Sequence, residues 1–489
     1  MKLDDPRLFR QYAYIDGKWT HGDAGREEAV IDPATNEVLG HIPLLEADQI
    51  RAAVDAADAA FVQWRALRVD ERCERLLAWY DLLQAHREDL AHLMTREQGK
   101  PLPDARGEVE YGASFVRWFA EEGKRTFGQT IPSHIPNAAL GTLKEPVGVA
   151  ALITPWNFPL AMITRKAAAA MAAGCTVVVK PAGETPFSAL ALAELAERAG
   201  IPAGVFNVVL GDAPMVSEVL CKEDRVKALS FTGSTPVGRL LLEQSASTVK
   251  RVSLELGGNA PFIVGPDVDP KEAALAAVAA KFQTAGQDCL AANRILVHES
   301  IHDEFVAHFA ERMLAFNVGN GLDSEIDIGP LIHRRAVDKA AAIVDDALSK
   351  GATLVQGDQN RAPGENFFMP TLLTEVTAEM KVWREENFAP VAGITRYSTD
   401  EEVIEMANDT EYGLSAYIFT HDIRRIWKIM RALKNGMVAV NTVKMTGPPI
   451  PFGGVKQSGL GREGGTAGIE EYLETKYYCL GGLGSVSGS

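Results

Sequence analysis

Short apolar segments alternate with alanine-rich helical segments from Gly148 onward, and this alternation limits the possible folds more than any other feature of the chain. The strand-like segments are residues 149–153, 176–179, 205–209, 226–231 and 251–254, and the helices between them include residues 165–173 and 187–199. Uninterrupted apolar strands that alternate with helices are typical of a parallel sheet with both faces covered. The pattern therefore predicts an α/β fold in which ligands bind beyond the carboxyl ends of the strands.

The chain is long enough for more than one domain. Its 489 residues exceed what a single core usually serves, and 46% of them are hydrophobic. Further helical patterns cover residues 46–66, 70–98, 271–283 and 301–316. A second α/β region begins at Asn259. Segments 128–144 and 468–478 fit neither region, so we expect them to serve as arms for subunit association.

Composition limits the classes of binding partner and the cellular compartment that we expect for this protein. A formal net charge of -16 argues against nucleic acid or an anionic membrane as a partner, because both select a basic face. The five cysteines form no CxxC pair, which favours a reducing compartment and argues against a zinc site. The N-terminus lacks the apolar run of a signal peptide, and no stretch approaches a membrane span. We therefore expect a soluble cytoplasmic protein that binds no metal.

One cysteine stands out as a candidate nucleophile. Cys289 ends the segment Gly-Gln-Asp-Cys and follows a helical segment, whereas the segment Glu-Leu-Gly-Gly begins at Glu255. A lone cysteine in a soluble protein is usually a small buried hydrophobe. Here Gly286 relieves crowding just before the thiol, and a carboxylate can serve as a base in a later step. The pattern indicates covalent thiol chemistry.

Two features suggest a nucleotide at the parallel sheet. The loop after strand 226–231 offers free amides around Gly233 and Ser234, and Pro236 suits the first turn of a helix. The loop is not a GxGxxG motif, so a plain strand–turn–helix is the alternative. Lys180 ends a buried strand and is either a surface lysine or a cation for ribose hydroxyls or phosphate.

Six ordered motifs resemble the successive signatures of the NAD(P)-dependent aldehyde dehydrogenase superfamily. They are TPWNFP at 154–159, FTGS at 231–234, ELGG at 255–258, GQDC at 286–289, EENF at 385–388 and PFGG at 451–454. Segments 162–166, 180–182, 185–196 and 457–464 resemble the succinate-semialdehyde dehydrogenase branch. The resemblance implies a Rossmann-type cofactor domain, an α/β catalytic domain and a small β oligomerisation arm.

The same resemblance suggests domain boundaries. We expect the NAD(P)-binding domain to comprise residues 1–127 and 147–257, the catalytic domain residues 258–441 with an active-site loop region at 442–467, and the arm and tail residues 128–146 and 468–489. An arm of this kind implies a homodimer or homotetramer.

The resemblance also assigns roles to individual residues. Cys289 is expected to add to the aldehyde, Asn157 to hold the resulting oxyanion together with the backbone N–H of Cys289, and Glu255 to activate the hydrolytic water. The cofactor is expected at Pro155, Trp156, Lys180, Ala182, Gly183, Gly233, Ser234, Leu256, Glu386 and Phe388.

Two departures from the family pattern concern the cofactor loops. Members that select NAD carry a glutamate three residues after the strand-end lysine, where this chain has Gly183 and places Glu184 one position later. No carboxylate at Gly183 opposes a 2′-phosphate, which favours acceptance of NADP while leaving NAD as a cofactor. Ala389 replaces the usual glycine after Phe388.

The expected substrate residues are Arg165, Gln283, Thr446 and Phe452. Semialdehyde enzymes place an arginine at both of the first two positions, so one cation for a substrate carboxylate is missing here. Lys444 supplies charge nearby or is simply solvated. Succinate semialdehyde is the first expectation, followed by glutarate or 2-oxoglutarate semialdehyde and then an uncharged or aromatic aldehyde. The alternative for Arg165 is that it only pairs with an acidic neighbour.

Two other function classes are compatible with this fold. A non-catalytic member of the same fold conflicts with the intact set of Cys289, Glu255 and Asn157. A relative that transfers the acyl group to coenzyme A lacks the hydrolytic glutamate, so Glu255 favours water as the acceptor.

Overall fold

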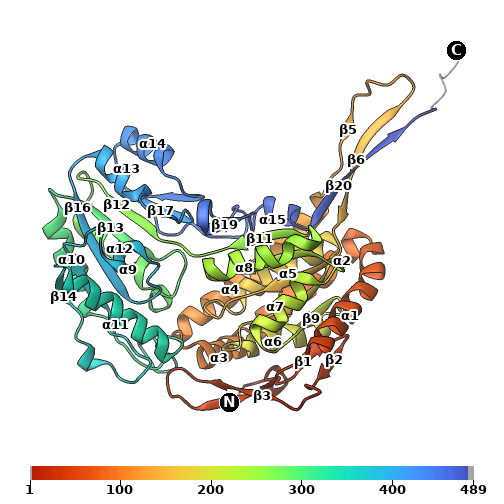
Figure 1. The fold of residues 1–489 in the computed structure, drawn as a ribbon, viewed down its shortest axis with the longest axis horizontal. Helices are drawn as coiled ribbons and strands as arrows, with labels where there is room; N and C mark the ends of the chain where they lie inside the picture. The colour runs from red at the N-terminus through yellow and green to blue at the C-terminus, as the bar shows by residue number, and fades with distance from the viewer. Residues whose placement is uncertain (1–2, 483–489) are drawn as a thin grey trace.

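Two α/β units lie side by side in the computed structural model, and a β arm extends away from them (Figure 1). The structure describes residues 3–482. Each unit has its own sheet and its own hydrophobic core. No helix within these residues is long and apolar enough to cross a membrane.

The first unit contains an eight-stranded sheet in the order β19-β11-β10-β7-β8-β9-β1-β2. Its strands are β1 (Ala13–Ile15), β2 (Lys18–Thr20), β7 (Val149–Ile153), β8 (Thr176–Lys180), β9 (Phe206–Val208), β10 (Val226–Thr232), β11 (Arg251–Glu255) and β19 (Gly459–Leu460). The five strands from β7 to β11 are parallel, as the alternating pattern predicts. A short hairpin of β3 (Glu27–Ile31) and β4 (Val38–Pro43) lies outside this sheet.

Helices cover both faces of this sheet. They are α1 (Ala47–Ala66), α2 (Val69–Ala85), α3 (Arg87–Gln98), α4 (Leu102–Glu122), α5 (Ala161–Ala173), α6 (Pro186–Arg198), α7 (Ala213–Lys222) and α8 (Thr235–Ser245). Every residue of α5 is buried, because its alanines let α4 and the sheet approach closely. The helical pattern over 70–98 is two helices rather than one, since His86 leaves helical geometry and caps both α2 and α3.

The second unit contains a seven-stranded sheet in the order β14-β15-β16-β13-β12-β17-β18. Its strands are β12 (Ala260–Val264), β13 (Ala292–His298), β14 (Thr353–Gln356), β15 (Thr371–Thr374), β16 (Val391–Tyr397), β17 (Ser415–Phe419) and β18 (Met437–Val440). Its helices are α9 (Pro270–Phe282), α10 (His302–Leu314), α11 (Arg334–Ser349), α12 (Lys381–Arg384), α13 (Asp400–Asn408) and α14 (Ile423–Ala432). All pairings are parallel except that of β14 with β15.

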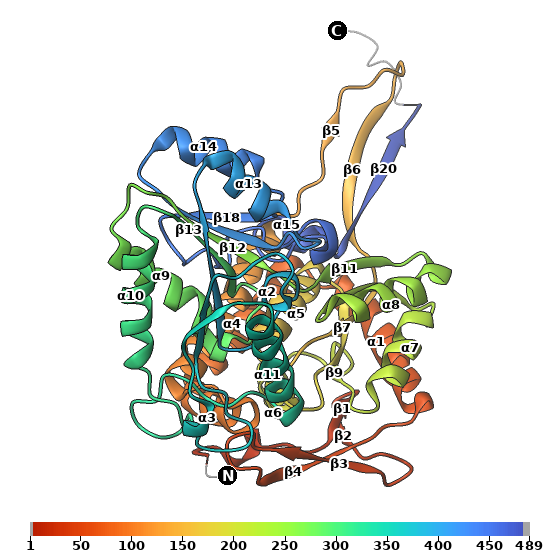
Figure 2. The same ribbon diagram turned by 60° about the vertical axis from the view of Figure 1, so that its left-hand side comes forward.

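The arm joins two segments that are far apart in the sequence. Strands β5 (Thr130–Ile131), β6 (Ala139–Pro146) and β20 (Leu473–Leu480) form a three-stranded antiparallel sheet, and the short helix α15 (Ala467–Glu470) precedes β20. Figures 1 and 2 show these strands projecting beyond both units. Both segments expected to form an arm therefore contribute strands to it, although residues 468–470 of the second segment lie in α15. Residues 483–489 of the expected tail lie outside the described residues.

Candidate active site

Cys289 lies where two cavities meet, one on each side of its side chain. It follows α9 through an irregular turn in which Thr284, Ala285 and Gly286 have φ values of 49°, 56° and 72°. A Cβ on Gly286 would overlap the backbone carbonyl of Ala389, so only glycine fits this position. The turn thereby ends the helix and directs the thiol into the gap between the units.

A buried ion pair fixes the loop that carries Asn157. Lys100 donates from Nζ to Glu108 Oε2 (2.5 Å) and to the backbone carbonyl of Asn157 (2.8 Å). The other oxygen of Glu108 accepts the N–H groups of Leu160 and Ala161 at the start of α5. The side-chain amide of Asn157 donates to the Gln287 carbonyl (3.0 Å), which places it beside the cysteine loop. Sequence reasoning missed Lys100 and Glu108, because no motif marks them.

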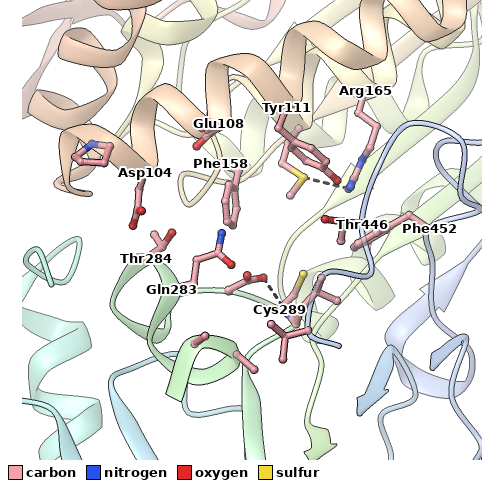
Figure 3. Close-up of a pocket in the computed structure, with 18 of the residues that line it drawn as sticks. Asp104, Glu108, Tyr111, Phe158, Arg165, Gln283, Thr284, Cys289, Thr446 and Phe452 are labelled. Atoms are coloured by element: carbon pink, nitrogen blue, oxygen red, sulfur yellow. Dashed lines mark hydrogen bonds between the residues drawn. The ribbon is translucent and has the colours of Figure 1, made fainter. Parts of the chain in front are cut away.

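The first cavity has a volume of about 330 Å³ and contains all four expected substrate residues (Figure 3). Arg165, Gln283, Thr446 and Phe452 line it, whereas Lys444 is exposed and lies outside it. Other lining residues were not anticipated as substrate contacts: Asp104, Glu108, Tyr111, Phe158 and Asp288. Asp288 was visible in the sequence as part of the cysteine motif, whereas Tyr111 lies on α4 with no local signal.

The second cavity lies at the carboxyl ends of β7 and β10 and contains six of the residues expected at the cofactor. They are Pro155, Trp156, Gly233, Ser234, Glu386 and Phe388. The rings of Trp156 and Phe388 meet edge to face with centroids 5.5 Å apart. The other four residues expected there lie outside this cavity, at the end of β8 or just after β8 and β11: Lys180, Ala182, Gly183 and Leu256.

Two ionisable side chains, Glu386 and Lys281, form hydrogen bonds at the wall of the second cavity. Glu386 Oε1 accepts the Gly258 N–H (2.9 Å), and burial raises the pKa of this carboxyl to about 7. Lys281 donates to the side-chain oxygens of Asn293 and Asn387 (2.8 Å each), and burial lowers the pKa of its ammonium to about 7. These bonds connect the end of α9 with the loop that carries Glu386.

Arg165 both lines the first cavity and belongs to a buried ionic group. Its Nε donates to Glu463 Oε2 (2.5 Å), and Lys166 pairs with the other oxygen of Glu463. Its guanidinium also lies 4.2 Å from the centroid of the Phe452 ring at the cavity wall. Burial opposes ionisation, but Arg165 and Lys166 hold the pKa of Glu463 below its usual value. Arg165 therefore pairs with an acidic neighbour and also lines the cavity, and its contact with a substrate stays a prediction.

Glu255 is buried away from both cavities. It is 2% exposed, and its carboxyl oxygens have no hydrogen-bond partner within residues 3–482. Burial and the negative charge of Glu463 raise its pKa well above the usual value. Its Oε1 lies against Gly453, where a Cβ would approach to 2.8 Å. This environment favours the neutral acid.

The thiol of Cys289 is also in an environment that favours its neutral form. Burial, Asp288 and Glu386 raise its pKa well above the usual value, while Arg165 acts in the opposite direction. Asp288 precedes it directly, and Asp288 Oδ1 accepts the Leu290 N–H (2.9 Å). A carboxylate beside a thiol disfavours the thiolate.

Comparisons with known proteins agree with the geometry. The aldehyde dehydrogenase family model matches residues 19–478. The chain is similar to the aspartate-semialdehyde dehydrogenase (non-phosphorylating) of Halomonas elongata, with 84% identity over 488 residues that cover 100% of this chain and 99% of that one. It is 52% identical over 481 residues to the Escherichia coli K12 succinate-semialdehyde dehydrogenase (NADP(+)), covering 98% of this chain and 100% of that one.

A solved structure shows the same fold. The succinate-semialdehyde dehydrogenase from Burkholderia pseudomallei has a TM-score of 0.97 and 49% identity, covering 98% of this chain and 100% of that chain. The chain belongs to the aldehyde dehydrogenase family. It is an NAD(P)-dependent aldehyde dehydrogenase that resembles the succinate-semialdehyde branch at about half of its positions.

The buried ionic group predicts a large effect of one neutral substitution. In Glu463→Gln, Arg165 and Lys166 lose their shared buried partner, so we expect the free energy of unfolding to fall by about 3–5 kcal/mol. Urea denaturation measures this change. The matched control is Glu470→Gln, which removes the half-exposed partner of Lys144 and should cost under about 1 kcal/mol. Equal small losses in both variants would contradict the role of the buried group.

Proposed function

We propose that this enzyme oxidises aspartate 4-semialdehyde to aspartate, with water and not phosphate as the acyl acceptor. The main support is the 84% identity, over the whole chain, to a relative with that printed activity. The first cavity supports it too, because Arg165 provides a cation for a short carboxylate near the thiol. Aspartate semialdehyde thus replaces succinate semialdehyde as the first choice of substrate.

We assign the covalent chemistry to Cys289. Its thiolate adds to the aldehyde carbon and forms a thiohemiacetal, whose oxyanion accepts hydrogen bonds from the Asn157 side chain and the Cys289 backbone N–H. Loss of a hydride from that carbon leaves a thioester. Glu255 then takes a proton from the water that hydrolyses the thioester, which requires its carboxyl to ionise and turn toward Cys289.

The residues present fit a nicotinamide cofactor in the second cavity. The N-cap of α8, Ser234, makes no side-chain capping bond, so the first amides of this helix are free to bind phosphate. Gly257 leaves space beside Glu386, since a Cβ there would come within 2.8 Å of Oε2. When bound, the cofactor supplies the acceptor for the hydride.

We further propose that each part of the structure has a separate role. The eight-stranded unit holds the cofactor and the seven-stranded unit carries Cys289, with the segment 442–467 closing the site. The arm of β5, β6 and β20 associates with another subunit to form a homodimer or homotetramer. Leu143, Tyr477 and Leu480 on this arm are exposed apolar side chains that such a contact would cover.

Acceptance of NADP depends on the carboxylate of Glu28, which lies on β3. Gly183 lacks a side chain, but Glu28 Oε2 lies 3.5 Å from the place where a Cβ of Gly183 would be. Burial lowers the pKa of the nearby Lys180 ammonium, and Glu184 and Glu28 oppose this effect. We propose that the enzyme accepts both cofactors and that Glu28, which is exposed, weakens the binding of NADP.

Glu28→Gln should therefore strengthen NADP binding relative to NAD by about fivefold, because it removes a negative charge near the 2′-phosphate. Quenching of tryptophan fluorescence gives both dissociation constants without turnover. The control is Glu27→Gln on the same strand, whose side chain faces the other side. A parallel change for both cofactors, or the same change in the control, would show that Glu28 does not discriminate between them.

The two steps of the chemistry can be separated by substitution. Cys289→Ala should abolish aldehyde oxidation, because no thiohemiacetal can form. Glu255→Gln should still release one equivalent of reduced cofactor in a burst and then stop, since only hydrolysis is lost. Stopped-flow absorbance of the reduced cofactor reports both results. Sustained turnover at the wild-type rate in Glu255→Gln would remove Glu255 from its assigned role.

A panel of three aldehydes tests the substrate. Aspartate semialdehyde should give a kcat/KM at least tenfold above that of succinate semialdehyde, and both should exceed butanal, which has the same chain length and no charge. Added inorganic phosphate should leave the rate and the free-acid product unchanged. If succinate semialdehyde matches or exceeds aspartate semialdehyde, the proposed substrate is wrong while the aldehyde dehydrogenase activity stands.

A further inference from the structure

Asp288 is a carboxyl group in the substrate cavity that forms no ion pair with a basic side chain within residues 3–482. Burial raises its pKa, and the more distant charges of Lys100 and Arg165 oppose this effect. Asp288 lines the cavity directly before Cys289, and its one hydrogen bond there is from the Leu290 N–H to Oδ1. A carboxylate in a partly buried site without an ionic partner is costly unless a ligand supplies the opposite charge. The proposed reaction steps use Cys289, Asn157 and Glu255, and they give no role to Asp288.

Two of the other charged residues of the cavity have partners in the protein. Glu108 accepts from Lys100 and from two backbone N–H groups, and Arg165 donates to Glu463 through Nε. Asp104 is a second carboxylate at the wall, and Figure 3 shows it beside Thr284 and apart from Cys289. Gln283 contributes no charge at the position where the semialdehyde branch was expected to carry an arginine. Among the described residues, the cavity therefore contains one cation, Arg165, and two carboxyl groups that form no ion pair. A substrate with both a carboxylate and an ammonium group would complement this set.

Aspartate semialdehyde and succinate semialdehyde share one carbon skeleton and differ only at carbon 2. The first carries an ammonium there, two carbon–carbon bonds from the aldehyde carbon, and the second carries a methylene. Cys289 must contact the aldehyde carbon, and Asp288, the residue before it in the chain, lines the same cavity. Arg165, in the opposite wall beside Tyr111 and Thr446, is left for the carboxylate (Figure 3).

We propose that Asp288 selects the substrate by accepting hydrogen bonds from its 2-ammonium group. This inference rests on the proposed function, which it extends from the carbon skeleton to the amino group. The pairing is a charge-assisted hydrogen bond in a partly dehydrated cavity, where such bonds are strongest. Succinate semialdehyde would leave the carboxylate without a partner, so the same residue also disfavours the competitor.

The test is Asp288→Asn, which keeps the shape of the side chain and removes its charge. We expect kcat/KM for aspartate semialdehyde to fall about 10- to 100-fold relative to that for succinate semialdehyde. The ratio of the two substrates is the relevant quantity, because loss of the charge also favours ionisation of the Cys289 thiol. This effect is larger for the substrate without an ammonium, so it lowers the ratio in the same direction. Asp104→Asn is the matched control and should leave the ratio within about threefold of wild type.

A binding measurement without turnover gives a second readout. L-Homoserine and 4-hydroxybutyrate are the alcohols that correspond to the two aldehydes, and we expect wild type to be inhibited at least tenfold more strongly by L-homoserine. Asp288→Asn should remove this difference. Asp288→Ser provides the same test if the amide disturbs the turn, and a thermal transition checks that each variant is folded.

The outcomes separate this inference from the proposed function. If wild type prefers aspartate semialdehyde but Asp288→Asn and Asp288→Ser keep the preference, Asp288 is not the selector and the substrate assignment stands. If Asp104→Asn alone removes the preference, the ammonium lies at Asp104 and the inference is wrong. If wild type does not prefer aspartate semialdehyde, both the substrate and the role of Asp288 are refuted.

Discussion

The pairing of one buried carboxylate with two buried cations is the interaction on which the rest of the site depends. Glu463 compensates Arg165 and Lys166 in the fully buried helix α5, where each cation alone would cost several kcal/mol. The same chain segment forms β19, which pairs with β11 and so reaches Glu255. A single side chain thus anchors the helix, holds Arg165 at the cavity wall and favours the neutral form of Glu255.

The surroundings of the proposed site residues depend on contacts from elements that are distant in the sequence. The Asn157 loop is fixed by the Lys100–Glu108 pair, which comes from the region between α3 and α4 and from α4 itself. Glu28 on β3 likewise returns a carboxylate to the neighbourhood of Gly183, from more than a hundred residues earlier in the chain. In both cases a residue distant in the sequence supplies a contact or a charge that the local motif lacks.

Sequence reasoning succeeded where a local pattern carried the signal. The alternation from Gly148 onward predicts the parallel sheet strand by strand, and the six ordered motifs identify the family and bring Cys289 and Asn157 to one place. It failed where the determinant is tertiary. Helical periodicity does not mark the break at His86. The cavity positions of Tyr111 and Asp104 depend on packing between distant elements, which periodicity does not encode. Gln283 and Asp288 were both visible in the sequence, but only the structure shows that the neutral amide and the carboxyl group line one cavity.

That shared cavity connects the choice of substrate with the reactivity of the nucleophile. Burial, Asp288 and Glu386 all hold the thiol of Cys289 in its neutral form, and Arg165 alone opposes them. A substrate ammonium that pairs with Asp288 offsets the nearest of these charges, so the thiol ionises more readily once such a substrate is bound. A substrate without the ammonium leaves the full repulsion in place. Selection by Asp288 would then act twice, through binding and through the population of thiolate, so a carboxylate that disfavours the thiolate in the free enzyme is compatible with catalysis.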